Sequence, residues 1–504
     1  MRSPILIGLD IGTSSCKALA IDENPQLLAS EAEEYPCAAP CPGWSEQNPA
    51  DWWQGACAAL SRLMQRIDPA RVAAIGLSGQ MHGMVALDAR HEVLRPAILW
   101  NDQRTSSQCE EITEAAGGPG GLLRLTNNAM LTGFTGGKIV WFRENEPELF
   151  ARCVKIVNPK DYINFRLTGE IATDVSDASG TGLYDVRHGR WSEELLGLLG
   201  ISPDLFAPVK ESSEIIATLS KEAAKLCGLP VGLPVVAGGG DAVLSAVGMG
   251  LEEAGQLAVT LGTSGVVARH VPAFFENGGA KLQFSRGCLP GLFHVMGVTL
   301  SAAGSYQWLE ALLGDPRLAT RGERYKALDQ AASLSPPGAN GVLFLPYLSG
   351  ERCPVNDAGA TGCFTGLRGQ TSKGDLARAV LEGVAFSLRQ VYDLMAAIPD
   401  SSGLATGPAR RLILAGGGAV SPLWRQIFAD AFALPVITLE AGDEGSGFGA
   451  AILAGLGTGV WAAPGEVLGR LRVKNETLPI DGHVPVYQER YAVYQGVYPA
   501  VRNL

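Results

Sequence analysis

The sequence predicts an α/β protein built from two related lobes. Three observations support this: strand-like apolar runs alternate with helix-like segments, glycine turns separate them, and the two halves of the chain repeat one plan. With 504 residues, 46% of them hydrophobic and 18% charged, the chain can fill two large cores. We predict an N-terminal lobe at residues 1–248 and a C-terminal lobe at 249–504, with a hinge at 249–255.

The two halves begin alike. Residues 5–10 form an apolar run that ends in Asp10, a Gly-Thr-Ser turn follows, and residues 17–21 form a second apolar run. Residues 256–270 repeat this order around a second Gly-Thr-Ser turn at 262–264. Two apolar runs joined by such a turn are typical of a β-hairpin.

Further matches support an internal duplication. A strand-like run enters three glycines at 235–241 and again at 412–419, and the runs at 75–82 and 296–301 both end in small polar residues. We interpret the members of each pair as counterparts, so that each half begins with a hairpin and ends in a glycine turn. Helices are predicted at 49–67 and 375–395, where apolar residues recur at helical spacing.

Composition argues against several functions. The net charge is −11 and no run of Lys or Arg is present, so nucleic-acid binding is not expected. No signal peptide is recognised, and no uncharged apolar stretch reaches the ~18 residues of a membrane span. A cytoplasmic protein is therefore expected. Ten dispersed cysteines without a CxxC motif predict reduced thiols. The sequence does not choose between a monomer and a homodimer.

The two Gly-Thr-Ser turns suit phosphate binding, because backbone amides and hydroxyls can surround phosphate oxygens where glycine leaves room. The chain lacks the GxxxxGK[ST] motif of P-loop proteins, and GxGxxG does not follow the first strand. Lys17 is either a charge partner of the phosphates or a solvated strand residue. The candidate phosphate contacts are Gly12, Thr13, Ser14, Lys17, Gly262, Thr263 and Ser264.

Two carboxylates stand at predicted strand ends. Asp10 could hold Mg²⁺, directly or through water, or could be an Asx-turn residue. Asp241 follows three glycines, where it could accept a proton from a substrate hydroxyl, or cap a helix beginning near Ala242. The later glycine turn could pack an adenosine against its backbone or could simply join a strand to a helix; its residues are Gly417, Gly418 and Ala419.

Other polar residues leave structural and functional interpretations open. His82 ends a strand-like run level with the other turns, which favours a sugar contact over a core position. Arg104, Lys138 and Lys160 are either structural or face an anion. Glu382 is either a buried partner or a solvated charge, whereas Trp52 and Trp53 are expected to pack.

Two long patterns identify a family. Residues 133–145 read GFTGGKIVWFREN, and residues 362–367 read GCFTGL, followed by DLARAVLE at 375–382. In this order they resemble the signatures of the FGGY carbohydrate kinases, and the resemblance covers essentially the whole chain. Shorter segments resemble the bacterial xylulokinases within that family; they lie at 44–47, 79–83, 96–102, 159–162 and 344–352.

The resemblance implies an actin-like fold of two ribonuclease-H-like domains, with the active site in the cleft between them. It implies ATP-dependent phosphorylation of D-xylulose to D-xylulose 5-phosphate. Asp241 would be the catalytic base and Asp10 the acid associated with Mg²⁺. The second Gly-Thr-Ser turn would contact phosphate, and the loop at 417–419 would contact adenosine. The implied sugar contacts are Met81, His82, Trp100, Asn101, Asp102 and Asp241.

One position departs from the xylulokinase pattern. Ala242 follows Asp241 where xylulokinases usually carry Asn, and alanine cannot hydrogen-bond a sugar hydroxyl. One such bond is worth about 0.5–1.5 kcal/mol. The alternatives are therefore an FGGY kinase for another ketose or polyol, an actin-like or heat-shock-like ATPase that controls a partner, and a sugar-binding regulator without catalysis.

Overall fold

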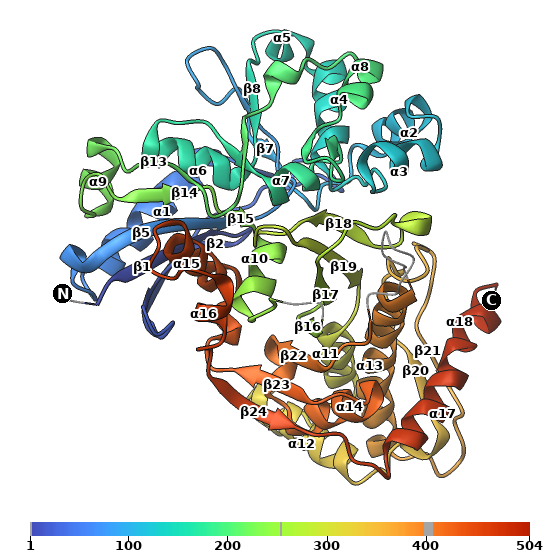
Figure 1. The fold of residues 1–504 in the computed structure, drawn as a ribbon. Helices are drawn as coiled ribbons and strands as arrows, with labels where there is room; N and C mark the ends of the chain where they lie inside the picture. The colour runs from blue at the N-terminus through green and yellow to red at the C-terminus, as the bar shows by residue number, and fades with distance from the viewer. Residues whose placement is uncertain (1–2, 253–254, 398–406, 504) are drawn as a thin grey trace.

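The computed structural model describes residues 3–252, 255–397 and 407–503 of the chain. Two lobes each enclose a seven-stranded mixed sheet, and both chain ends lie on the surface (Figure 1). The predicted α/β class and two-lobed architecture are confirmed. Part of the predicted hinge, residues 253–254, lies outside the described residues.

The first sheet has the strand order β13-β14-β5-β1-β2-β3, with β15 alongside β5. The strand β1 pairs antiparallel with β2, and β2 with β3, whereas β5 runs parallel to β1 and β14 runs parallel to β5. The bounds are β1 (Ile5–Ile11), β2 (Ser15–Asp22), β3 (Leu27–Glu34), β5 (Val72–Gly79), β13 (Ile215–Thr218), β14 (Pro234–Val236) and β15 (Gly239–Gly240).

The second sheet has the order β18-β19-β17-β16-β22-β23-β24. Here β16, β17 and β19 form the antiparallel part, and β22 and β23 run parallel to β16. The bounds are β16 (Gln256–Leu261), β17 (Gly265–Val271), β18 (Gln283–Arg286), β19 (Phe293–Thr299), β22 (Arg411–Ala415), β23 (Val436–Leu439) and β24 (Val473–Thr477). The repeated plan expected from the sequence is therefore present in the two sheets.

The pairing of repeats that we inferred from local patterns is wrong in two places. Strand β22 lies parallel to the first strand of its sheet, so its counterpart is β5 and not the strand that leads to Asp241. Strand β19 is the third antiparallel strand, so its counterpart is β3 and not β5. Glycine turns mark where strands end, but only pairing in the sheet shows which strands correspond.

Helices cover the sheets where apolar spacing predicted them. The predicted helix at 49–67 is α1 (Pro49–Met64), which starts where the Asn48 side chain accepts a hydrogen bond from the amide of Ala50. Trp52 and Trp53 are buried, as expected for packing residues. The helix predicted at 375–395 is α13 (Lys373–Ala397), which packs against β17, β19 and α14 of the second lobe.

Two helices lie at the junction of the lobes, α10 (Asp241–Gly248) and α15 (Gly445–Gly457). Although α15 follows the second sheet in sequence, it packs on β1 and β5 of the first sheet. Glycine makes this approach possible: a Cβ on Gly8 would lie 1.8 Å from the Gly447 carbonyl oxygen, and one on Gly248 would lie 2.1 Å from that of Gly445.

The remaining elements complete the two lobes. In the first lobe they are β4 (Glu46–Gln47), β6 (Val85–Leu87), β7 (Ala97–Ile98), β8 (Lys155–Val157), β9 (Thr173–Asp174), β10 (Tyr184–Asp185), β11 (Arg190–Trp191), β12 (Val209–Lys210), α2 (Ser106–Ala115), α3 (Pro119–Thr126), α4 (Thr135–Asn145), α5 (Pro147–Phe150), α6 (Pro159–Thr168), α7 (Val175–Gly180), α8 (Glu193–Leu199) and α9 (Lys221–Cys227). In the second they are β20 (Leu343–Leu345), β21 (Cys363–Thr365), α11 (Ala303–Leu313), α12 (Arg321–Ser333), α14 (Pro422–Phe432), α16 (Pro464–Leu468), α17 (Val484–Gln495) and α18 (Val497–Val501).

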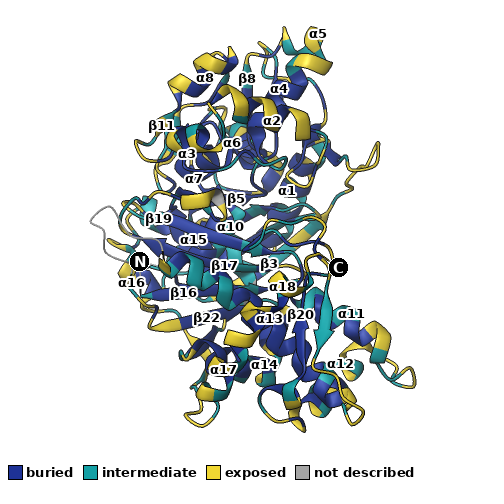
Figure 2. Cartoon of the chain, turned by 90° about the vertical axis from the view of Figure 1, so that its right-hand side faces the viewer, coloured by how far each residue is buried: buried dark blue, intermediate teal, exposed yellow. Residues whose placement is uncertain are grey.

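Buried residues fill both sheets and the junction helices, whereas exposed residues lie on the outer helices and loops (Figure 2). Among the described helices, none has both the length and the apolar character that crossing a membrane requires.

Candidate active site

The candidate site forms where three strands of the first sheet end together. Asp10 of β1 lies opposite Ser78 of β5, and Gly240 of β15 lies opposite Gly79 of the same strand. Since these strands are parallel, their carboxyl ends meet at one edge of the sheet. Asp10 and Asp241 therefore emerge beside each other, as the sequence analysis expected for its two candidate carboxylates.

The Asp10 carboxylate lies close to unpaired. Its Oδ1 atom is buried and accepts no hydrogen bond from the residues that the structure describes. Burial raises the pKa of Asp10, and the nearby hydroxyls of Ser78 and Ser446 and the charge of Lys17 only partly offset that effect. An orphaned, buried carboxylate oxygen is a site where a cation would be favourable.

Asp241 is the first residue of α10, and Gly240 is the N-cap, so Asp241 does not cap the helix. Its Oδ1 accepts a hydrogen bond of 2.7 Å from the amide of Ala242. Burial, and secondly repulsion from the Asp10 carboxylate, raise the pKa of Asp241 to about 7. A carboxylate with this pKa can exchange a proton near neutral pH.

The first Gly-Thr-Ser turn is held in place by side chains from elsewhere in the lobe. The Tyr35 hydroxyl donates to the Gly12 carbonyl oxygen at 2.6 Å, and Gln47 Nε2 donates to the Thr13 carbonyl oxygen at 2.7 Å. The Thr13 hydroxyl donates to Gln80 Oε1 at 3.2 Å. We did not predict these three anchors; Gln47 and Gln80 stand in segments that carry the family resemblance, but Tyr35 carries no local signal.

Lys17 connects the first hairpin to the junction helix α15. Its ammonium group forms an ion pair with Glu444, the residue before α15, and a third of its side chain is exposed. Within the described parts of the chain, the amides of Thr13 and Ser14 donate no hydrogen bond. The turn therefore presents free amides, while Lys17 is already neutralised by a carboxylate.

The second Gly-Thr-Ser turn is more open. The side chains of Thr263 and Ser264 are exposed, and the amides of both residues donate to no group in the described ranges. The turn is held through its backbone, because the Thr263 carbonyl oxygen accepts hydrogen bonds from the amides of Ala302 at 2.8 Å and Gly304 at 3.1 Å. These donors lie at the beginning of α11.

The loop at 416–419 stands next to the second turn. Strands β16 and β22 are parallel, with Thr260 opposite Ala415, so both turns leave the same edge of the second sheet. Gly416 has φ 86°, and a Cβ there would lie 2.7 Å from the Leu261 carbonyl oxygen. A Cβ on Gly417 would meet no atom within 4 Å, so this stretch of backbone is open to a ligand. Gly418 and Ala419 are buried below it.

Met81 and His82 follow β5 at the site. His82 has φ 67°, its Nδ1 lies 2.6 Å from the Gly180 carbonyl oxygen, and its ring lies 4.7 Å from that of Phe134. Burial lowers the pKa of His82 to about 3, so the ring is neutral. Since Nδ1 donates to a carbonyl, Nε2 carries the lone pair that can accept from a sugar hydroxyl.

The segment Trp100, Asn101 and Asp102 divides between surface and core. Trp100 is 44% exposed, and its Nε1 donates to the Thr13 hydroxyl at 2.9 Å. Asn101 is exposed. Asp102 is fully buried, and its carboxylate accepts from the Ser45 amide at 2.6 Å and from both Nε and Nη2 of Arg104. Asp102 therefore fixes the loop that presents Trp100.

The cationic residues left open by the sequence are structural. Arg104 also pairs with Glu46 at 2.8 Å. Lys138 is buried and donates to the carbonyl oxygens of His82 at 2.7 Å and Gly133 at 2.6 Å, which supports the strained His82 backbone. Lys160 is buried among aspartates. Glu382 is a buried partner that accepts from Arg378 at 2.7 Å.

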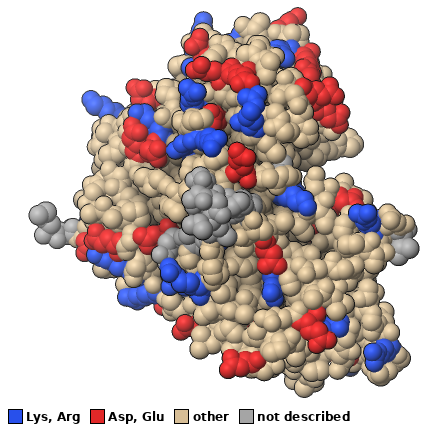
Figure 3. All heavy atoms as spheres, turned by 45° about the vertical axis from the view of Figure 1, so that its right-hand side comes forward, with Lys and Arg blue, Asp and Glu red and all other residues tan. Residues whose placement is uncertain are grey.

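The two lobes meet around this site. Ala242 packs both with the apolar cluster that contains Met81 and with the cluster that contains Met296 of the second sheet. Beside it, Asn128 of the first lobe exchanges hydrogen bonds with the Phe284 backbone of β18, at 2.7 and 2.9 Å. The surface is hollowed between the lobes, and on this face basic residues are scattered among acidic ones (Figure 3).

Comparisons with known proteins agree with this geometry. Residues 5–248 match the model of the N-terminal domain of the FGGY family of carbohydrate kinases, and residues 257–458 match that of its C-terminal domain. A xylulose kinase of Escherichia coli (strain K12) is 38% identical, with 98% of each chain covered. A gluconokinase of Bacillus subtilis (strain 168) is 32% identical over 90% of this chain and 88% of its own.

A solved structure extends the likeness to three dimensions. The crystal structure of a xyloylose kinase from Brucella ovis superposes with a TM-score of 0.90 at 36% identity, covering 99% of both chains. The fold and the strand-end site define an actin-like phosphotransferase. The chain belongs to the FGGY family of carbohydrate kinases, and it is an ATP-dependent sugar kinase.

Proposed function

We propose that this kinase transfers the γ-phosphoryl group of ATP to the terminal hydroxyl of D-xylulose, giving D-xylulose 5-phosphate and ADP. The observation that supports this most directly is the pair of buried carboxylates, Asp10 and Asp241, at adjoining strand ends below two phosphate-type turns. The names of the relatives most similar in sequence supply the sugar: they are xylulose kinases at 33–38% identity over almost the full chain.

Asp241 is the proposed catalytic base. Its carboxylate takes the proton of the substrate hydroxyl as the hydroxyl oxygen attacks the γ-phosphorus, and the bond from that phosphorus to the ADP oxygen breaks on the opposite side. A pKa of about 7 suits this role, since the group is largely ionised slightly above neutrality and still basic enough to hold the proton. Asp241→Asn should retain ATP binding and lose transfer.

Asp10 is the proposed acid for Mg²⁺, directly or through water. Its buried Oδ1, which accepts no hydrogen bond from a described residue, fits a cation better than a structural turn does. Bound Mg²⁺ would neutralise charge on the β- and γ-phosphates. The positive charge would also offset the repulsion between the Asp10 and Asp241 carboxylates.

The ATP phosphates are assigned to the two Gly-Thr-Ser turns, whose available amides suit anions. The contacts are proposed at Gly12, Thr13, Ser14, Gly262, Thr263 and Ser264, with adenosine against Gly417, Gly418 and Ala419. Lys17 orders the first turn through Glu444 and would reach a phosphate only by exchanging that partner.

The sugar is assigned to the first lobe, beside Met81, His82 and Trp100, with its reactive hydroxyl at Asp241. His82 Nε2 accepts a hydroxyl proton, and the half-exposed Trp100 ring offers an apolar face. Asn101 is exposed nearby, whereas Asp102 acts by holding the loop. Ala242 supplies no polar contact, so specificity depends on the remaining groups.

The test is ADP production with Mg·ATP against D-xylulose, D-ribulose, L-xylulose, L-ribulose, D-fructose, glycerol and gluconate. We expect the highest kcat/KM with D-xylulose. A clear preference for another of these compounds would replace D-xylulose while retaining the kinase chemistry. Asp241→Asn is the companion variant: near-normal turnover in it would remove Asp241 from the role of base.

A further inference from the structure

The backbone that carries Asp241 has no side chains of its own to hold it. Residues 238–240 are all glycine, and Gly238 has φ 76°. A Cβ on Gly239 would lie 2.3 Å from Cys288 Sγ, and one on Gly240 would lie 2.5 Å from Met81 Cγ, so larger residues do not fit. Glycine costs backbone stiffness, and the position of Asp241 must therefore be fixed by contacts from outside.

One buried hydroxyl supplies such a contact. Ser176 Oγ, in the short helix α7, accepts a hydrogen bond of 3.0 Å from the amide of Gly240, the residue before Asp241. The same hydroxyl donates to Asp174 Oδ2 at 2.6 Å. Since a serine hydroxyl has a single hydrogen, donating it to Asp174 turns the oxygen lone pairs toward Gly240.

Asp174 is itself fixed on several sides. It is fully buried, forms an ion pair with Lys160 at 3.0 Å, and accepts from the Ser212 hydroxyl at 2.8 Å. Lys160 is also fully buried and pairs in addition with Asp161 at 2.5 Å and Asp177 at 3.3 Å. Buried ionic groups that have partners hold fixed geometries, because breaking one contact leaves an uncompensated charge.

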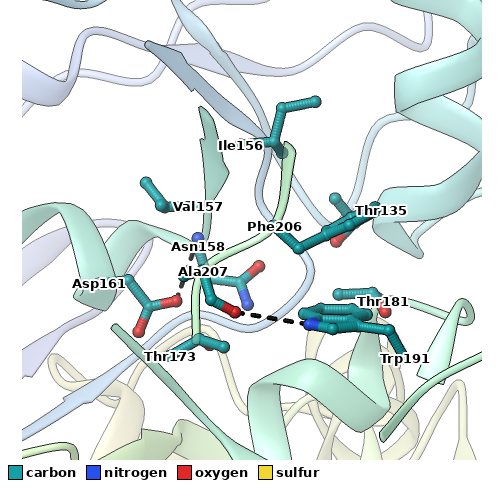
Figure 4. Close-up of a pocket in the computed structure, with 10 residues that line it drawn as sticks. All are labelled: Thr135, Ile156, Val157, Asn158, Asp161, Thr173, Thr181, Trp191, Phe206 and Ala207. Carbon is teal, nitrogen blue, oxygen red and sulfur yellow. Dashed lines mark hydrogen bonds between the residues drawn. The ribbon is translucent and has the colours of Figure 1, made fainter. Parts of the chain in front are cut away.

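The surroundings of this cluster exclude bulk water. The adjoining pocket, lined in part by Asp161 and Thr173, measures about 10 Å³, and its labelled side chains close around it (Figure 4). That space is at most enough for one water molecule, so it is not a sugar site. Loss of the Ser176 hydroxyl would therefore leave the Gly240 amide without a ready substitute.

We propose that Ser176 is a positioning residue for phosphoryl transfer, which holds Asp241 in register through the chain Lys160, Asp174, Ser176 and the Gly240 amide. This rests on the proposed role of Asp241 as base. None of these groups touches the reacting atoms; their effect reaches the site through the backbone. Misplacing a reacting group by about 1 Å costs on the order of 10²-fold in rate.

The test compares Ser176→Ala with Ser212→Ala. Both substitutions remove a fully buried hydroxyl that donates to Asp174 Oδ2, but only Ser176 also contacts Gly240. We expect kcat to fall by about 10- to 100-fold in Ser176→Ala, with KM for Mg·ATP within about twofold of the parent. Ser212→Ala should retain kcat within about threefold at a similar loss of Tm. Equal losses of kcat, or a kcat within twofold in Ser176→Ala, would overturn the proposal.

A double variant separates this proposal from that for Asp241. If Ser176 acts through Asp241, then Ser176→Ala/Asp241→Asn has the residual kcat of Asp241→Asn alone, because the two effects are not additive. Multiplied losses would overturn it. An active Asp241→Asn would instead count against the proposed base. Should Ser176→Ala fail to fold, Ser176→Cys fills the same space with a weak acceptor, and the same loss of kcat is expected; normal kcat would contradict the inference.

Discussion

The two Gly-Thr-Ser hairpins have one sequence motif and two different environments. Each joins the first two strands of its sheet, yet the first turn is tied by Tyr35, Gln47 and Gln80, whereas the second is held through its backbone and exposes Thr263 and Ser264. The paired residues before and after the turn enclose four residues in the first hairpin and three in the second. The motif therefore defines a turn, and the neighbours decide what the turn can do.

The residue two places before each turn shows the same contrast. In the first hairpin it is Asp10, with an orphaned buried oxygen; in the second it is Thr260, whose hydroxyl donates to Met249 Sδ at 3.7 Å. The strands behind the turns differ as well. His270 of β17 lies opposite His294 of β19, whereas β2 and β3 pair Ala20 with Ala29. Only the first hairpin carries a charge at its mouth, and only the second buries ionisable rings.

The largest effect is expected at the mouths of the hairpins. Asp10→Asn should lower kcat by about 10²- to 10³-fold, because the amide loses the negative charge that would face Mg²⁺. Thr260→Val, at the matching position, should leave kcat within about threefold, since it removes only one weak contact. Steady-state kinetics over a range of Mg²⁺ concentrations measure both. Equal losses would mean that the two hairpins do not differ in function.

The histidine pair should make the second lobe sensitive to acid. Burial lowers the pKa of His270 to about 4 and that of His294 well below its ordinary value. Between pH 6.5 and 4 the unfolded chain therefore binds more protons than the folded protein, and the free energy of unfolding falls as pH falls. Each histidine contributes a slope of about 1.4 kcal/mol per pH unit.

His270→Gln should remove one such slope, so that its unfolding free energy declines less than that of the parent as pH falls from 6.5 to 5. Denaturant unfolding at several pH values measures the difference. His188→Gln, at an exposed position, is the matched control and should keep the parental slope. Parallel curves for the His270 variant and the parent would contradict the prediction.

The smallest effect is expected at the anchor of the first turn. Tyr35→Phe removes the hydroxyl that bonds the Gly12 carbonyl oxygen, an interaction worth about 1 kcal/mol. We expect a rise of a few-fold in KM for Mg·ATP. Tyr498→Phe removes a similar bond to Asp357 in α18 and should leave KM unchanged. An unchanged KM in Tyr35→Phe would show that the first turn needs no more support than the second.

Local pattern predicted the elements near the site. The hairpins, the helices at 49–67 and 375–395 and the glycine turns were found within a few residues, because strand alternation, helical spacing and turn chemistry are written in neighbouring residues. The candidate carboxylates were found for the same reason, since each stands where an apolar run stops. Which strands pair could not be found in this way, and the counterparts of β22 and β19 were assigned wrongly.

By itself the sequence determined the family, the two-lobed α/β plan and the chemical groups at the strand ends. Only the tertiary structure decided that α15 returns to the first sheet, that Asp102 holds a loop, and that Ser176 reaches Gly240 across 64 positions of the chain. The physical reason is range. Propensity and periodicity act over a few residues, whereas burial, pKa shifts and hydrogen bonds between distant segments exist only after the chain has closed around them.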